Sequence, residues 1–372
     1  MIQILVFIFI LIGITGGRLV FFNPKFVTQT NINTVKNAPI SIIIPAKNEA
    51  GNLTSLITSI LQQTAQCEII VVNDASDDDT SAVLKNYDVL EVKLRENPWK
   101  GKSFVCYKGV EYASHELIIF IDADIVFTDN RALEQMISLY AKQNNSGVLS
   151  IQPRHRTKRL YEKLSTVFNL TTVMGINVFS AFKSLNTLST VFGPVLMTNQ
   201  RDYKVTGGHK ASKAKIIEGE GIFTAYQKNS LPVKLFLAGD SIGMRMYPNG
   251  LKELSAGWSK HIARGSTNTH PIHMAMIILF LGCGITAFSF LLISLIVPNI
   301  SVIFALAAYI LYGIVFYFLA DKVIRLNVID IFIFPLYIVF FFIIYGLSWY
   351  NINIKKQVIW KGQQIAVKDD ND

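Results

Sequence analysis

Apolar and polar residues between positions 39 and 151 follow a pattern that predicts strands and helices in turn. Short, continuously apolar runs predict buried strands at Ile40–Pro45, Cys67–Asn73, Asp88–Leu94, Leu117–Asp122 and Gly147–Ile151. The intervening segments have helical spacing near Ala50–Gln62, Gly101–Ser114 and Arg131–Lys142. Apolar strands separated by helices are typical of a parallel sheet covered on both faces. We therefore predict an α/β domain with a mostly parallel sheet.

Long segments without any charged side chain lie at both ends of the chain. They are Met1–Gly17, Met274–Val297, Ser301–Ala320 and Ile331–Tyr350. The last three approach the ~20 residues that a helix needs to cross a bilayer. The first lacks a basic start and a small-x-small cleavage site, which favours an uncleaved anchor over a signal peptide. We predict an anchor at 1–22, a catalytic domain at 38–265 and membrane helices within 272–350.

The basic residues suggest an orientation. Arg18 and Lys25 directly follow the first apolar segment, which favours a cytoplasmic catalytic domain and a multi-pass protein of the cell membrane. A net charge of +9 suits a protein beside an anionic leaflet. The basic residues are not interleaved with aromatic residues on one polar domain, so they do not indicate binding to nucleic acid. Three carboxyl-terminal spans would leave the basic tail 351–372 outside. We expect Pro335 to break Val328–Tyr350 into a re-entrant or interfacial hairpin that keeps this tail cytoplasmic.

The apolar segment Leu164–Phe182 follows a basic cluster of Arg154, Arg156, Lys158 and Arg159. A membrane crossing here would place Asp122 and the later polar segment on opposite sides of the bilayer. We therefore expect an interfacial helix lying in the headgroup plane and held by these charges. A solvated run of charges is the alternative.

Two carboxylates follow a predicted strand at Asp122 and Asp124. Side chains two residues apart in an extended segment project to the same side, so both acids can reach one cation. Oxygen ligands suit Mg²⁺ or Mn²⁺, with phosphate oxygens completing the shell. The polar segments Pro45–Glu49 and Asn73–Asp77 are expected at the same sheet edge, where such folds bind ligands. Two solvated acids at a strand end are the alternative explanation.

Several motifs occur in the order and spacing of family 2 glycosyltransferases, which the chain resembles: Ser41–Glu49, Val72–Thr80, Gly101–Ser103 and Asp122–Asp124. Further motifs resemble members of that family that glucosylate a carotenoid acid: Gln152-Pro153, Phe168–Leu170, Met174–Phe179, Phe192–Pro194, Gly207–Lys210, Ile216–Gly219, Arg245–Tyr247, Gly257–His261 and Trp360–Gly362. The resemblance covers nearly the whole chain. It implies a GT-A nucleotide-sugar-binding fold and inverting transfer.

The resemblance also implies roles for individual residues in binding the donor. Asp74 would hydrogen-bond the uracil ring, with Pro45, Ala46 and Glu49 lining the base and ribose pocket. An Asx turn or helix cap is the structural alternative for Asp74. Lys102 would contact the nucleotide or its diphosphate.

Asp122 and Asp124 would hold the metal that bridges the diphosphate, unless one of them contacts ribose instead. The metal would neutralise charge on the departing UDP.

The expected catalytic base departs from the family pattern. Many members have Glu-Asp where this chain has Glu218-Gly219, and that Asp is usually the base. Either Glu218 or Glu220 takes the role, or the acceptor needs none. A carboxylic acid acceptor has a pKa near ~4 and is already an anion at neutral pH. The missing Asp therefore favours a carboxylate acceptor.

Trp258 and Lys260 stand where many relatives have an Arg-Trp pair near the sugar and diphosphate. Trp258 would stack on a ring and Lys260 would contact phosphate, or Trp258 packs an amphipathic helix on the membrane. The histidines at 155, 209, 270 and 273 are too dispersed to predict a metal site. Cys67, Cys106 and Cys283 lack the paired spacing of a disulfide framework or zinc site.

The resemblance, together with the apolar segments, implies a membrane-bound, metal-dependent enzyme that moves glucose from UDP-glucose to the carboxylate of a C30 carotenoid acid. The acceptor would be dissolved in membrane lipid, and association with other enzymes of a pigment pathway is expected. Transfer to another lipid (a diacylglycerol, a ceramide-like lipid or a polyprenyl phosphate) and a non-catalytic membrane scaffold are the alternatives. The intact acid pair argues against the scaffold.

Overall fold

The computed structural model describes residues 1–27, 38–99, 101–182, 190–213, 218–267, 269–353, 357–360 and 363–366. Within these ranges, side chains are described except at 260–267 and from 352 onward. The chain divides into two compact units. The sheet unit comprises Lys25–Arg154 and Ser189–Arg245, and the helical unit comprises Met1–Pro24, His155–Leu188 and Met246–Asp372. The expected catalytic range 38–265 is thus shared between the two units.

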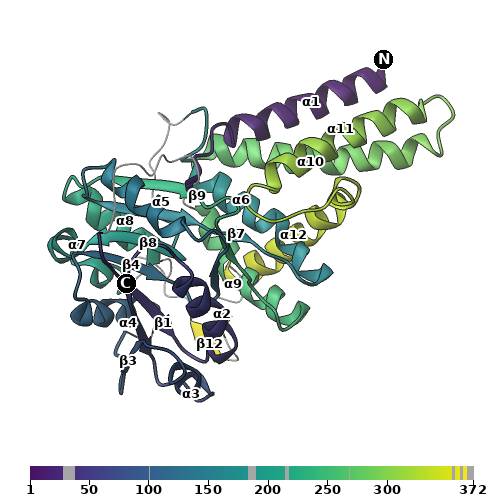
Figure 1. The fold of residues 1–372 in the computed structure, drawn as a ribbon. Coiled ribbons are helices and arrows are strands. Elements are labelled where there is room, and N and C mark those ends of the chain that lie inside the picture. The colour runs from purple at the N-terminus through teal and green to yellow at the C-terminus, as the bar shows by residue number, and fades with distance from the viewer. Residues whose placement is uncertain are drawn as a thin grey trace. The chain divides into compact units, whose positions relative to one another are not determined.

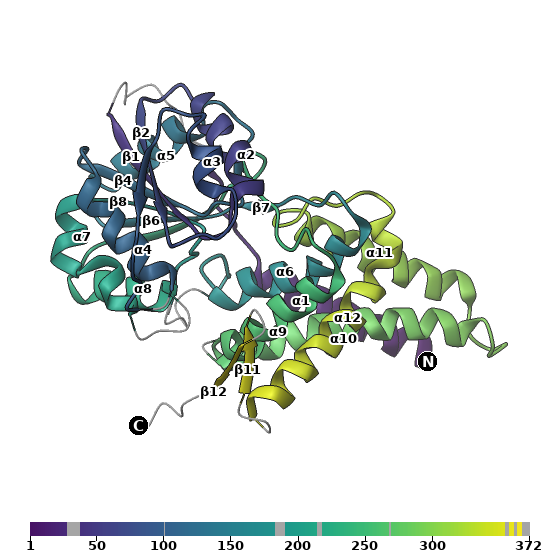
Figure 2. The same cartoon turned by 90° about the horizontal axis from the view of Figure 1, so that it is seen from below.

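A seven-stranded sheet forms the core of the sheet unit, in the order β3-β2-β1-β4-β8-β6-β9. Figure 2 labels β2, β1, β4, β8 and β6 of this sheet. Its strands are β1 (Ile40–Ala46), β2 (Cys67–Asn73), β3 (Leu90–Lys93), β4 (Leu117–Ile121), β6 (Val148–Gln152), β8 (Val195–Asn199) and β9 (Val233–Leu237). β1 pairs in parallel with β2 and β4, β2 with β3, and β6 with β9. The predicted α/β class and mostly parallel sheet are confirmed, and each strand predicted from the sequence is present.

β8 is an interior strand of the sheet that the sequence pattern did not predict, and the edge strand β9 was not predicted either. It runs antiparallel to both β4 and β6, so it breaks the alternation of strand and helix on which the prediction relied. All of its residues are buried. Because it is antiparallel, its first residue lies at the carboxyl end of β4, where Ile121 pairs with Val195. This placement brings Gly193 and Pro194 to the edge that carries Asp122.

Helices connect the strands of the sheet unit. They are α2 (Ala50–Leu61), α3 (Thr80–Leu84), α4 (Lys102–Gly109), α5 (Ala132–Ala141), α7 (Gln200–Thr206) and α8 (Glu218–Lys228), with 3₁₀ turns η2 (Val110–Tyr112) and η5 (Gly208–Ser212). α4 packs closely on β1 and β2, because Gly109 leaves no room for a side chain: an added Cβ would lie 2.5 Å from Ile43 Cγ2. A second, three-stranded sheet has the order β5 (Ile125–Phe127), β10 (Ile242–Met244), β7 (Arg154–His155).

The helical unit contains the long apolar helices. Its elements are α1 (Ile2–Val20), η3 (Leu160–Ser165), α6 (Thr166–Ile176), α9 (Leu251–Thr267), α10 (Pro271–Ser294), α11 (Val302–Ala320), α12 (Asp330–Asn353), β11 (Gln357–Trp360) and β12 (Gln363–Ala366). By length and composition, α1, α10, α11 and α12 can each cross a membrane. Figure 1 shows α1, α10 and α11 side by side, while α12 runs in a different direction.

Small residues let α1 pack tightly on α10. A Cβ added at Gly17 would lie 2.5 Å from Cδ2 of Phe280, and one added at Gly13 would overlap Cys283. Gly13 and Gly17 are four residues apart, so they share one face of α1. This is the small-xxx-small arrangement by which helices approach each other closely in membranes.

The expected helix over Leu164–Phe182 is shorter in the structure. α6 ends at Ile176, where Asn177 adopts a left-handed conformation with φ 65°. Most of its side chains are buried among α9, α10, α11 and α12, so α6 is an internal helix of the helical unit. Contact of this segment with headgroups stays a prediction.

The expected break at Pro335 is wrong. α12 continues from Asp330 to Asn353 with Pro335 inside it. Pro335 lies in the second turn, so only the hydrogen bond to the Ile331 carbonyl is lost. Gly313 of α11 packs against that freed carbonyl, since an added Cβ there would overlap its oxygen. Close packing on α11 therefore accommodates the proline without a hairpin.

Candidate active site

Two loops at the carboxyl ends of β1 and β2 are tied together by hydrogen bonds. The Asn48 N–H donates to Ser76 Oγ at 2.9 Å, and the Asp77 N–H donates to Asn48 Oδ1 at 2.9 Å. The Glu49 N–H donates to Thr80 Oγ1 at 3.1 Å. Asn48 has a φ of 59°, a conformation that asparagine tolerates better than most residues. The two polar segments predicted to share one edge of the sheet therefore do so.

Asp74 is held from two sides at this edge. Its Oδ2 accepts a hydrogen bond from Asn97 Nδ2 at 2.9 Å and lies 3.8 Å from Lys47 Nζ. Its N–H donates to the carbonyl of Ala46 at 2.8 Å. Asn97 had no sequence signal, because a single amide in a loop has no characteristic spacing.

Pro45 and Ala46 end β1 next to Asp74, while Glu49 caps α2 and accepts a hydrogen bond from Asn52 at 2.7 Å. Base and ribose binding by these residues stays a prediction.

Asp122 and Asp124 lie in a turn between β4 and β5. The Ile125 N–H donates to the Asp122 carbonyl at 3.2 Å, and β4 ends at Ile121. The two acids therefore do not lie in the extended segment that the prediction assumed, since β4 ends at Ile121 and Asp124 lies in the turn. The turn is fixed from outside: the Asp122 N–H donates to Pro194 O at 3.0 Å, and the Asp124 carbonyl accepts from the Arg245 N–H at 3.2 Å.

Lys102 connects the acids of the site. It is the first residue of α4, and its Nζ lies 2.6 Å from Asp122 Oδ1 and 3.8 Å from Glu218 Oε2. The same ammonium donates to the carbonyl of Gly193 at 3.0 Å. These two acids raise the pKa of Lys102 although burial opposes them, so the side chain stays cationic. The site therefore holds a fixed positive charge beside Asp122.

The acids around Asp124 carry more negative charge than Lys102 compensates. Burial, followed by the charges of Asp122 and Glu49, raises the pKa of Asp124 to about 7. Such a carboxyl group gains most from an additional cation nearby. Two carboxylates with this excess of negative charge fit a hard divalent ion such as Mg²⁺ or Mn²⁺. The residues present therefore suit the metal that the sequence predicts.

Glu218 is more acidic than an ordinary glutamate. Burial favours its neutral form, but the charge of Lys102, followed by the contact with His209, outweighs burial and lowers the pKa of Glu218 to about 2. Its position in the first turn of α8 also favours a carboxylate. A group with so low a pKa is a weak base at neutral pH.

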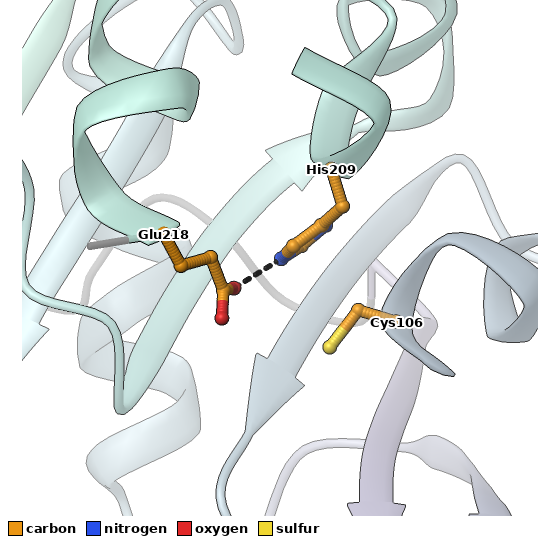
Figure 3. A group of neighbouring side chains, drawn as sticks. All are labelled: Cys106, His209 and Glu218. Atoms are coloured by element: carbon orange, nitrogen blue, oxygen red, sulfur yellow. Dashed lines mark ion pairs between the residues drawn. The ribbon is translucent and has the colours of Figure 1, made fainter. Parts of the chain in front are cut away.

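Cys106, His209 and Glu218 form a cluster within the sheet unit (Figure 3). One ligand atom from each lies within 4.8 Å of the others, as in a metal site. However, His209 Nε2 lies 2.7 Å from Glu218 Oε1 and its Nδ1 lies 2.9 Å from Tyr203 Oη, so protein groups face both ring nitrogens. Burial raises the pKa of Cys106 well above its ordinary value, so the thiol keeps its proton. The cluster supports Glu218 better than it would bind an ion.

Tyr203 and His209 are site residues that were not predicted from the sequence. Histidine was expected here only as a metal ligand, and Tyr203 belongs to no recognised motif. The Gly207–Lys210 motif was the available signal for His209.

Gly219 has a steric role where the family usually has Asp. A Cβ added there would overlap the carbonyl oxygen of Val191 and lie 2.6 Å from Thr190 Oγ1. No side chain fits without moving this backbone. Glu220 is half-buried two residues further along α8. Its expected role as a base stays a prediction.

Trp258 lies in the core of the helical unit. Its ring stacks on Phe168 at a centroid distance of 4.8 Å, and its Nε1 donates to Ser165 Oγ at 2.9 Å. These contacts match the packing alternative, while stacking on a sugar stays a prediction. Lys260 is part of α9, and its side chain lies outside the described residues.

Comparison with known proteins agrees with the fold and the motifs. The family model "Glycosyl transferase family 2" matches residues 41–204. The chain is 38% identical over 354 residues to 4,4′-diaponeurosporenoate glycosyltransferase of Staphylococcus aureus strain N315, covering 94% of each chain. The protein of that name from strain USA300 is 37% identical over the same length, again with 94% of each chain covered.

A solved structure shares the fold at low sequence identity. It is a mannosyltransferase from Pyrobaculum calidifontis in complex with GDP-Man and Mn2+, with a TM-score of 0.53 and 15% identity over 89% of this chain and 95% of that one. This likeness concerns the fold alone. Together with the extent of the match to the staphylococcal enzymes, the comparisons establish that the chain is a member of glycosyltransferase family 2.

Proposed function

We propose that the protein transfers glucose from UDP-glucose to the carboxylate of 4,4′-diaponeurosporenoate, a C30 carotenoid acid, and forms a glucosyl ester. The name of the staphylococcal relatives supports the acceptor, since the match covers 94% of both chains. The observation that carries the proposal is the state of Glu218. Its pKa of about 2 makes it a poor base, and the neighbouring position is a glycine that admits no side chain.

An acceptor that is already an anion removes the need for a base. A lipid hydroxyl must lose its proton as it attacks, whereas a carboxylic acid with a pKa near ~4 has lost it at neutral pH. In the proposed step, a carboxylate oxygen forms a bond to C1 of glucose. The bond from C1 to the β-phosphate oxygen breaks, and its electron pair leaves with UDP. The configuration at C1 inverts and no proton moves.

The acids and the lysine of the site stabilise the departing diphosphate. Asp122 and Asp124 would hold Mg²⁺ or Mn²⁺, which supplies Lewis-acid neutralisation of charge when bound. Lys102, kept cationic by Asp122 and Glu218, adds a second positive charge on the same side of the site. Asp74, with Asn97 beside it, would recognise the uracil ring.

A transfer assay tests this proposal. Membranes containing the protein are incubated with UDP-[¹⁴C]glucose, Mn²⁺ and a carotenoid-acid extract, and the product is identified by mass. We expect labelled glucosyl ester, lost with Asp122→Asn and retained with Asp88→Asn, an exposed acid that precedes β3. Label on glycerolipid alone would reject the carotenoid acceptor.

Substitution of Glu218 tests the absence of a base. Removal of a general base typically costs ~10²–10⁴ in rate. We expect Glu218→Gln to keep at least about a tenth of the wild-type kcat on the carotenoid acid. A loss in the range typical of a base would show that Glu218 takes a proton and would favour a hydroxyl acceptor.

The proposed location is the cell membrane, with the catalytic residues and the tail on the cytoplasmic side. Both ends of α12 contact polar elements of the helical unit. Lys163 Nζ of η3 lies 2.6 Å from Asp330 Oδ2, and Ser348 Oγ donates to the Ser259 carbonyl of α9. α9 carries too many charged side chains to cross a bilayer. We therefore propose that α12 does not cross the membrane and that the chain after it continues on the side where α9 lies.

A further inference from the structure

We propose that His209, held by Tyr203, is a positioning residue that fixes Glu218 and thereby the Lys102 ammonium that faces the donor diphosphate. This inference rests on the proposed use of a nucleoside diphosphate sugar. It assigns to the histidine an action through two other side chains rather than contact with the reacting atoms. The contacts form a series in which Tyr203 meets His209, His209 meets Glu218, and Glu218 meets Lys102. Lys102 in turn pairs with Asp122.

His209 and Glu218 form a close pair inside the sheet unit. Nε2 of His209 lies 2.7 Å from Oε1 of Glu218, as the dashed line in Figure 3 marks. Among the described residues neither atom has a hydrogen-bond partner outside this pair, and His209 is only 1% exposed. Leaving a buried polar atom without a partner is unfavourable. The pair is therefore strongly favoured in this arrangement.

Tyr203 determines which ring nitrogen carries the proton. Its hydroxyl oxygen accepts the backbone N–H of His209 at 3.1 Å and lies 2.9 Å from Nδ1. Burial raises the pKa of Tyr203 well above its ordinary value, so the hydroxyl keeps a proton that it can donate to Nδ1. In a neutral imidazole the other nitrogen then bears the hydrogen. We therefore assign a hydrogen on Nε2, directed at Glu218.

Close packing fixes the orientation of the imidazole ring. It meets the ring of Phe120 edge-on at a centroid distance of 4.4 Å, and Phe120 stacks on Tyr203 at 5.4 Å. Gly208 has a φ of 49°, and an added Cβ there would overlap the Tyr203 ring. Phe120 belongs to β4 and lies two residues before Asp122. Its contact with the imidazole therefore fixes the position of His209 relative to the strand that leads to this acid.

Glu218 transmits this position to Lys102. One carboxylate oxygen faces His209 and the other lies 3.8 Å from Lys102 Nζ. Lysine is a flexible point charge with rotatable bonds along its stem, so its location depends on its partners. Asp122 at 2.6 Å and Gly193 O at 3.0 Å provide the remaining contacts. Loss of His209 would free Glu218 to turn, and Lys102 would lose one of its two anionic partners.

The test measures the dissociation constant of UDP with Mn²⁺ for the purified full-length protein. We expect His209→Phe to weaken UDP binding about tenfold, as loss of supporting contacts commonly does. His209→Gln should stay within about threefold of wild type, because its Nε2–H can replace the lost donor. In a Lys102→Met background, His209→Phe should change the constant less than about twofold, because the two residues act in one chain.

The outcomes separate this inference from the proposed function. An equal effect of His209→Phe with and without Lys102, or equal weakening by Gln and Phe, would overturn it. Thermal unfolding of each variant shows whether it folds. If His209→Phe does not fold, Tyr203→Phe removes only the hydroxyl and should weaken UDP binding in the same direction, and unchanged binding would count against the inference. A wild-type protein that binds UDP without glucosylating carotenoid acid would refute only the proposed function.

Discussion

Charge is unbalanced at the carboxyl edge of the sheet, and Asp124 shows it most clearly. Lys102 pairs with Asp122 and lies near Glu218, so its positive charge is shared between these two acids. Little of it compensates the negative charge of Asp124. Burial and the charges of Asp122 and Glu49 then raise the pKa of Asp124 to about 7. A proton and a metal ion therefore compete for this carboxylate near neutral pH.

Metal affinity should therefore depend on pH between 6 and 8. Below about pH 7 Asp124 binds a proton, so the apparent dissociation constant for Mn²⁺ should rise by up to about tenfold per pH unit. Above that pH it should level off. Calorimetric titration of Mn²⁺ checks this, with Asp88→Asn as the unaffected control. A constant value across this range would contradict the electrostatic account.

The same shift has a consequence for the metal-free protein. A carboxyl whose folded-state pKa is raised costs stability once pH exceeds the unfolded value, and the full cost is present above pH 7. Asp124→Asn should raise the unfolding temperature at pH 8 by about 2–4 °C and leave it nearly unchanged at pH 4. Scans in chelator at both pH values measure this difference. Equal shifts at the two pH values would argue for a packing effect instead.

Gly219 provides a steric prediction at the same scale. Gly219→Ala places a methyl group on the Val191 carbonyl, so overpacking should cost about 1–3 kcal/mol and lower the unfolding temperature. Gly219→Asp should do the same without adding a working base. Gly51→Ala in α2 is the matched control, since no atom lies within 4 Å of its added Cβ. If thermal scans give the same unfolding temperature for the two alanine variants, this explanation of the missing Asp is wrong.

At the scale of elements, one helix pair depends on missing side chains. α1 approaches α10 through Gly13 and Gly17, which face Cys283 and Phe280. α1 therefore packs as a member of a bundle with α10 and α11. Its proposed retention as an uncleaved anchor is consistent with this packing.

Gly17→Leu should separate α1 from α10. Overpacking of about 1–3 kcal/mol predicts an unfolding temperature lower by at least about 2 °C for the detergent-solubilised protein. Gly282→Leu in α10 is the control, because an added Cβ there meets nothing within 4 Å. If both variants melt like wild type, the glycine contact contributes nothing measurable.

At the scale of the whole molecule, the path of the chain through the membrane depends on α12. Its amino-terminal half packs on α11, where Phe334 lies 4.9 Å from Tyr312 between ring centroids. Its later part meets Phe168, whose ring lies 5.0 Å from Phe341. The buried pair of Lys163 and Asp330 fixes its start. By apolar composition alone α12 would be assigned as another membrane crossing. The contact of Ser348 with Ser259 shows that its far end lies beside α9.

Reporter fusions test this path. Green fluorescent protein fused after Asp372 should fluoresce, and alkaline phosphatase at the same position should be inactive. Fusions in the charge-free loop after α10, at Val297, should give the opposite pattern if α10 crosses. Active phosphatase at the carboxyl terminus would show that α12 spans the bilayer.

Sequence periodicity was sufficient for strands β1, β2, β3, β4 and β6 and for helices α2, α4 and α5, because local hydrophobic pattern reports burial directly. It did not predict β9, which pairs in parallel with β6. The motifs were sufficient to place Asp74, Lys102 and Asp122 at one edge. Charge-free length likewise indicated α1, α10, α11 and α12 as apolar helices.

Contacts between distant residues were decided only by the tertiary structure. β8 lies between β4 and β6 by antiparallel pairing, and His209 reaches Glu218 through turns and packing that have no fixed spacing. Pro335 remains helical because α11 packs against the carbonyl that it frees. Local pattern encodes which residues are buried, whereas the identity of their partners depends on how the chain closes in three dimensions.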